Sequence, residues 1–132
     1  MLVFFDTSAF VKRYVNEPGT GKVLEWCDKA AEIGLSGIAL PEIISAFCRL
    51  HREARITDAQ YRQLKSMLLA DIEDAALCDL TPAVLAQAVS NLENNVSLAP
   101  FIAHEAPGFG REMWFCKTSA GALTRADDHR RR

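Results

Sequence analysis

The sequence predicts an α/β fold, in which short parallel strands alternate with amphipathic helices. Three short apolar runs, at residues 2–5, 33–38 and 75–80, have the length and composition of buried strands. Between these runs, apolar residues recur at the spacing of a helix that buries one face. Strands that alternate with such helices form βαβ units, whose strands run parallel.

Composition limits the classes of protein to which the chain can belong. Its 132 residues, 49% hydrophobic and 24% charged, are enough for one globular domain. No apolar stretch reaches about 18 residues, so no membrane span is expected, and a signal peptide is not indicated. The four cysteines form no C-x-x-C pair, which favours the thiols of a cytoplasmic protein over disulfides or a zinc site.

The first apolar run, residues 2–5, ends directly at Asp6. In an open α/β sheet, ligands bind at the carboxyl ends of the strands, so a carboxylate there faces a crevice. Thr7 or Ser8 can cap the short helix that is expected over residues 8–15. Two interpretations of Asp6 are therefore open: a functional carboxylate at the sheet edge, or a cap of this helix.

The later helices are predicted from their end signals. The segment Glu17-Pro18-Gly19 ends the first helix, and helical periodicity returns over residues 20–32. Pro41 suits the first position of a third helix, because that position needs no backbone N–H. Thr57 and Gln60 match a capping box at the start of the fourth helix.

The regular pattern ends after the fifth helix, which Thr81 and Pro82 begin. Prolines and glycines then interrupt residues 96–132. Residues 113–116 have the composition of a short strand but no convincing partner, and the polar C-terminus resembles a frayed tail. We therefore divide the chain into a core, residues 1–95, and a divergent segment of the same domain, and we expect the C-terminal part of the fold to be incomplete or irregular.

A second acid is expected at the same sheet edge as Asp6. Glu42 lies in the first turn of the third helix, just after the second strand. Its simplest role is to complement the helix dipole. Two carboxylates at one edge repel each other unless a hard cation neutralises them, and Mg²⁺ and Mn²⁺ prefer oxygen ligands. Such an ion activates water and polarises phosphate. The pair therefore predicts a divalent metal site, with a structural role for both acids as the alternative.

Basic residues near these acids could contact a phosphate backbone. Lys12 and Arg13 follow Asp6 within two helical turns, and the third helix carries further cations, Arg49, Arg52 and Arg55 with His51. A solvated basic surface is the alternative interpretation of both groups.

Three segments of the chain resemble a PIN domain, and more narrowly the VapC-type ribonuclease toxins of prokaryotic toxin–antitoxin pairs: Leu2-Val3-Phe4-Phe5-Asp6-Thr7-Ser8-Ala9, Lys12-Arg13-Tyr14 with Glu17-Pro18-Gly19, and Leu40-Pro41-Glu42-Ile43. The resemblance covers residues 1–95. It implies a three-layer α/β/α sandwich and the activity of a Mg²⁺- or Mn²⁺-dependent endoribonuclease. It also implies that the protein is a homodimer and is inhibited by a small cognate antitoxin. Asp6 and Glu42 match the family's first two metal-binding acids, and Ser8 matches the hydroxyl residue that supports the site.

The chain departs from this family after residue 95. The family's third acid belongs near residues 98–102, which here read Leu98-Ala99-Pro100-Phe101-Ile102. Glu105 is a candidate substitute, and Asp127 is a candidate for the fourth acid. A reading-frame shift near codon 96 would explain the change. Two functions therefore remain: a metal-dependent ribonuclease, or a catalytically inactive PIN-like module that binds an antitoxin or another partner without cleaving.

Overall fold

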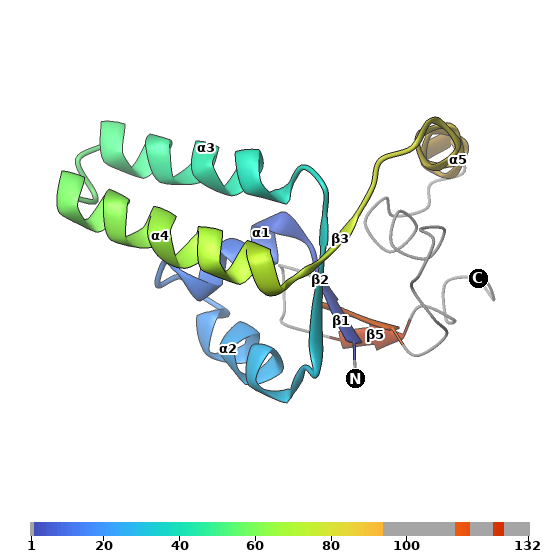
Figure 1. Ribbon diagram of the computed structural model, residues 1–132, viewed down its shortest axis with the longest axis horizontal. Coiled ribbons are helices and arrows are strands. Elements are labelled where there is room, and N and C mark those ends of the chain that lie inside the picture. Colours follow the sequence, from blue (N-terminus) through green and yellow to red (C-terminus); the bar gives the residue numbers. More distant parts are fainter. Residues whose placement is uncertain (1, 94–112, 117–122, 126–132) are drawn as a thin grey trace.

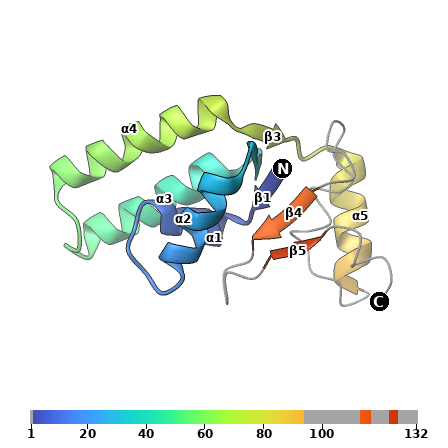
Figure 2. The same cartoon turned by 90° about the horizontal axis from the view of Figure 1, so that it is seen from below.

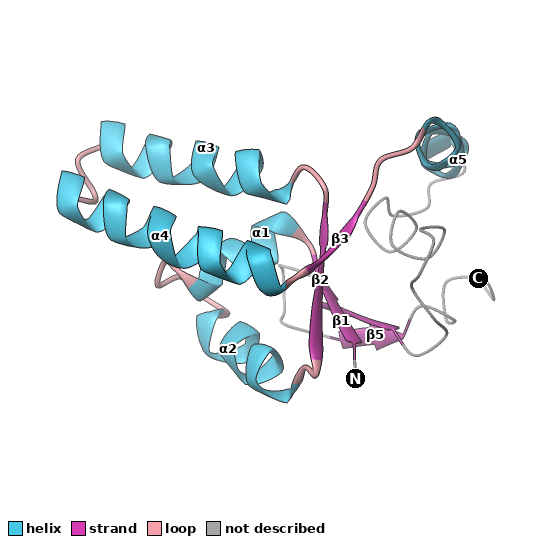
Figure 3. Cartoon of the chain, viewed as in Figure 1, coloured by secondary structure: helices cyan, strands magenta, loops and turns pink. Residues whose placement is uncertain are grey.

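The computed structural model describes residues 2–93, 113–116 and 123–125. The helices and strands of the first range alternate as the sequence predicts (Figures 1 and 3). In chain order the elements are β1 Leu2–Phe5, α1 Thr7–Phe10, the 3₁₀ helix η1 Val11–Arg13, α2 Thr20–Lys29, β2 Glu32–Ser36, α3 Ala39–Arg52, α4 Asp58–Asp74, β3 Ala76–Cys78, α5 Pro82–Glu93, β4 Met113–Cys116 and β5 Leu123–Arg125.

The strands form one sheet in the order β3-β2-β1-β4-β5. β1 lies at its centre and runs parallel to β2 and β4, β2 runs parallel to β3, and β5 is antiparallel to β4. Helices α1 to α4 lie on one side of the sheet and α5 lies on the other (Figures 1 and 2). The predicted α/β fold with a short parallel sheet between helical layers is thus confirmed.

The pairing of β4 corrects one expectation. Residues 113–116 were expected to lack a partner, but β4 pairs with β1 over its whole length, with Trp114 opposite Val3. β5, over residues 123–125, was not predicted and pairs with β4. The pairing of β4 with β1 spans more than a hundred residues and depends on tertiary contacts that local sequence does not record. β5 is close to its partner in sequence, and it can be placed only once β4 has been placed.

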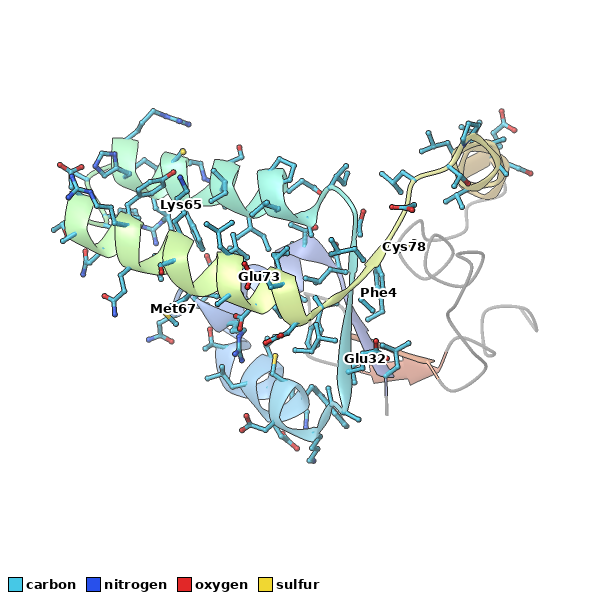
Figure 4. The ribbon with its side chains drawn as sticks, viewed as in Figure 1. Phe4, Glu32, Lys65, Met67, Glu73 and Cys78 are labelled. Carbon is cyan, nitrogen blue, oxygen red and sulfur yellow. The ribbon has the colours of Figure 1, made fainter. Side chains whose placement is uncertain are left out.

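β1 is buried on both faces, as its apolar composition predicts. Val3, Phe4 and Phe5 are at most 2% exposed. Successive side chains of a strand point to opposite faces, and Phe4 points away from α3 and α4 (Figure 4). Its neighbours join the core between sheet and helices, whose buried residues are Val3, Phe5, Ala9, Phe10, Val23, Cys27, Leu35, Ala39, Ile43, Phe47 and Leu68.

The predicted helix caps of α4 and α5 are confirmed. The Gln60 backbone N–H donates to Thr57 Oγ1 at 3.1 Å, and Gln60 Oε1 accepts from the Thr57 N–H at 2.8 Å, which completes the capping box. At the start of α5, the Val84 N–H donates to Thr81 Oγ1 at 3.3 Å. These bonds satisfy backbone donors that the first turn of a helix leaves without partners.

Cys27, Cys48 and Cys78 are present as thiols rather than disulfides, as predicted. Cys27 lies on α2 and Cys78 lies on β3, and both are buried. Burial raises the pKa of both thiols above the ordinary value, because the thiolate is poorly solvated there.

A salt bridge joins Arg13 of η1 to Asp71 of α4. Arg13 Nε donates to Asp71 Oδ2 at 2.9 Å, Arg13 Nη2 lies 3.4 Å from Asp71 Oδ1, and the Tyr14 hydroxyl donates to the same carboxylate. The Tyr14 ring packs edge-on against Phe10 and Phe47 of the core. Burial, and then the hydrogen bond to Asp71, raise the pKa of Tyr14 above its usual range, and the hydrogen bond to Asp71 raises that of Arg13.

We expect Asp71→Asn to lower the free energy of unfolding by about 1–3 kcal/mol, because it removes the negative charge that accepts hydrogen bonds from both Arg13 and Tyr14. The side chains of Arg13 and Asp71 are only 30% and 26% exposed. Chemical denaturation measures the change. Asp74→Asn, an exposed acid on the same helix, is the matched control and should change stability by less than about 0.5 kcal/mol. Equal effects of the two substitutions would contradict a special role for Asp71.

The C-terminal end of α3 forms a Schellman motif with an unusual residue at its turn. The Ala54 N–H donates to the His51 carbonyl and the Arg55 N–H donates to the Leu50 carbonyl, both at 3.0 Å. Ala54 has a φ of 55°, in the left-handed region that favours glycine. An alanine there carries backbone strain, since its Cβ crowds the following carbonyl.

Ala54→Gly should therefore stabilise the protein by roughly 0.5–1 kcal/mol, the relief of strain being partly offset by the greater freedom of glycine in the unfolded chain. Thermal or chemical denaturation tests this. The control is Ala70→Gly inside α4, at an exposed position, which should destabilise by about 1 kcal/mol. Destabilisation by both substitutions would show that the turn is not strained.

Candidate active site

The two predicted acids meet at one edge of the sheet. β1 and β2 run parallel and adjacent, so their carboxyl ends lie together. Asp6 follows β1 directly, and Glu42 lies in the first turn of α3, which follows β2. Both side chains line a single pocket of about 310 Å³.

Asp6 stands at the N-cap position of α1 without using its side chain as a cap. Its backbone carbonyl accepts the N–H groups of Ala9 and Phe10 at 2.9 Å, and its carboxylate makes no capping bond. The carboxylate instead accepts the Ser8 hydroxyl at 2.8 Å. The interpretation of Asp6 as a side-chain cap is therefore wrong, and so is the capping role for Thr7 or Ser8, because both lie inside the helix.

Glu42 is exposed and accepts a hydrogen bond from across the pocket. Thr7 Oγ1 donates to Glu42 Oε1 at 3.2 Å, and this bond joins α1 to α3. Each acid thus has one hydroxyl donor, Ser8 for Asp6 and Thr7 for Glu42. This role of Thr7 is not predicted from the sequence. A hydroxyl pair directly after the first acid is the only signal for it, and that signal fits a helix cap equally well.

The rest of the pocket is lined by two hydroxyl residues, three apolar residues and, in the described part of the chain, a single cation, Arg49. The lining residues are Asp6, Thr7, Ser8, Val11, Glu42, Ile43, Ala46 and Arg49. Each carboxylate keeps oxygen lone pairs beyond the one its hydroxyl donor occupies.

This donor set fits a hard divalent cation. Mg²⁺ is commonly bound by one or two carboxylates, the remaining positions being filled by water and substrate phosphate. Among the residues that the structure describes, no three Asp, Glu, His or Cys side chains are grouped closely enough to hold a metal ion. Asp6 and Glu42 would therefore supply the protein ligands of this part of the chain.

The two predicted RNA contacts, Lys12 and Arg13, are held away from the pocket by other partners. Lys12 Nζ donates to the Pro18 carbonyl at 2.7 Å, and Arg13 is bonded to Asp71. Neither lines the pocket, and contact of these two with RNA stays a prediction. Glu105 and Asp127 lie outside the described residues.

Comparisons with known proteins bear on the fold. Neither the family sequence models nor the curated protein sequences give a match. A solved structure that is similar is VapC20 of Mycobacterium tuberculosis, a sarcin–ricin loop cleaving toxin, with a TM-score of 0.52 and 18% identity over 76% of each chain. At this identity the likeness shows the fold alone, and it supports the PIN-like fold inferred from the residues.

In the part of the chain that the structure describes, none of the helices has the length and apolar character that a membrane span requires.

We expect Mn²⁺ to bind the purified protein in a calorimetric titration, and Asp6→Asn and Glu42→Gln each to weaken binding at least about tenfold. The reason is that loss of a residue that only supports a metal ligand already lowers metal affinity about 10–100-fold, and loss of a direct ligand should lower it at least as much. Asp28→Asn, an exposed acid on α2, is the control and should bind as wild type. Loss of binding in only one of the two acid variants would show that the carboxylates do not share an ion.

Proposed function

We propose that this chain is a Mg²⁺- or Mn²⁺-dependent endoribonuclease of the PIN type, which hydrolyses RNA phosphodiester bonds. The observation that carries the proposal is the meeting of Asp6 and Glu42 in one pocket at the carboxyl edge of a parallel sheet. Support also comes from the PIN-like sequence segments and from the similarity of the fold to that of a toxin that cleaves the sarcin–ricin loop.

In this proposal the chain's own residues hold and orient the reacting groups. Asp6 and Glu42 would hold the ion, which when bound lowers the pKa of water and polarises the scissile phosphate. Ser8 and Thr7 hold the two carboxylates by their hydrogen bonds, so that fewer rotamers must be fixed when substrate arrives. Glu105 and Asp127 would be further acids of the site.

The partners follow from the same resemblance. We infer a cytoplasmic homodimer that acts on RNA and is inhibited by a cognate antitoxin.

A second function is favoured by one observation. The stretch where the resemblance places a third acid, residues 98–102, holds no carboxylate, and two acids line the pocket in the described part of the chain. A PIN-like module of this composition would bind an antitoxin or another partner without cleaving RNA.

RNA cleavage separates the two functions. With Mn²⁺ present, the purified chain should cut single-stranded RNA, and Asp6→Asn should reduce the rate at least about 100-fold, because it removes a ligand of the ion that activates water. A chelator should have the same effect. Asp28→Asn is again the control and should retain full activity.

Two outcomes would contradict the proposal. Cleavage that survives both Asp6→Asn and the chelator would come from a contaminant or from another site. Metal binding without cleavage at any Mn²⁺ or Mg²⁺ concentration would identify the inactive module.

A further inference from the structure

Arg49 lies at the end of the pocket remote from the two acids. We propose that its guanidinium binds a non-scissile phosphate of single-stranded RNA and so positions the strand across the acid pair. The inference rests on the proposed ribonuclease function and adds a substrate-positioning residue to it.

The placement follows from helix geometry. Arg49 is seven residues after Glu42 on α3, and Ala46 lies between them. Residues at this spacing share one face of a helix, and a rise of about 1.5 Å per residue separates the two by about 10 Å along the axis. All three line the pocket, so the pocket runs along α3 from an acidic end to a cationic end.

The charge environment leaves the Arg49 guanidinium available. It is exposed, and it forms no ion pair with a carboxylate in the part of the chain that the structure describes. Arg49 is therefore not a direct counter-ion of Asp6 or Glu42. Arg13 differs, because its guanidinium is held by Asp71. An available guanidinium matches the geometry of a phosphate, which it can bind with two parallel hydrogen bonds.

Ala46, between Glu42 and Arg49 on α3, lines the pocket together with Val11 and Ile43. These three side chains are uncharged and apolar, and they do not compete for a phosphate. A nucleotide whose two phosphates lie at the two ends would place its sugar and base over this surface. Single-stranded RNA fits this arrangement, because its bases are open to contact in a way that those of a duplex are not.

The alternative is a basic surface that acts only through its overall charge. His51 and Arg52 also lie in the last turns of α3, but neither lines the pocket. A general electrostatic effect would make the arginines of α3 equivalent. A positioning role requires Arg49 to differ from Arg52, and this difference can be measured.

The experiment is a binding titration without cleavage. A short, fluorescently labelled single-stranded oligoribonucleotide is titrated with the full chain in a chelator, and anisotropy gives the Kd at several salt concentrations. We expect Arg49→Gln to raise the Kd about tenfold and to reduce the slope of log K against log salt by about 0.7, the value for one phosphate contact on a single strand. Arg49→Lys should restore part of the affinity, since it keeps the charge. Arg52→Gln is the matched control and should bind nearly as wild type.

Several results would overturn the inference. Equal weakening by Arg49→Gln and Arg52→Gln would indicate a general basic surface, and an unchanged Kd in Arg49→Gln, or no binding of RNA by the wild-type chain, would remove the role of Arg49 altogether. Circular dichroism checks that each variant is folded.

Activity with Mn²⁺ separates this inference from the proposed function. If the wild-type chain cleaves RNA, Arg49→Gln should raise KM about tenfold with a smaller change in kcat. If it binds RNA through Arg49 but does not cleave, the proposed activity fails and the phosphate contact stands. If it cleaves and Arg49→Gln leaves KM unchanged, the contact fails and the activity stands.

Discussion

The parallel pairing of β1 with β2 is the constraint on which the candidate site depends. Because the two strands run in the same direction, whatever follows each of them emerges at the same edge of the sheet. Asp6 follows one strand and the first turn of α3 follows the other, so two acids separated by 36 positions line one pocket. An antiparallel pairing would have placed them at opposite edges. The burial of β1 on both faces fixes this arrangement, since each large apolar side chain withdrawn from water contributes about 1.5–3 kcal/mol.

The parts of the fold that could be predicted from the sequence are those set by neighbouring residues. A capping box depends on two side chains three positions apart, and Thr57 with Gln60 forms it as expected. Burial on both faces requires an uninterrupted apolar run, and residues 2–5 provide one. The edge position of Asp6 and Glu42 could be inferred as well, because strand direction follows from the alternation of strands and helices.

The parts that could not be predicted depend on residues far apart in the chain. The position of β4 beside β1 needs a contact across more than a hundred residues. Arg13 was interpreted as a phosphate contact or a solvated cation, and it proves to be paired with Asp71, 58 positions away. The Thr7 hydroxyl could cap a helix turn or bind a distant carboxylate, and in the structure it donates to Glu42. In each case the sequence shows the group but not the partner that faces it.

The reactivity of the two buried thiols, Cys27 and Cys78, reports on local opening of the fold. A thiol reacts with an alkylating reagent as the thiolate, and burial disfavours that form at Cys27 and Cys78 while also shielding both sulfurs. Alkylation of either residue must therefore wait for a local opening. Cys27 belongs to α2 and Cys78 to the edge strand β3, so the ratio of their modification rates compares how often α2 leaves the sheet with how often β3 detaches from its neighbour.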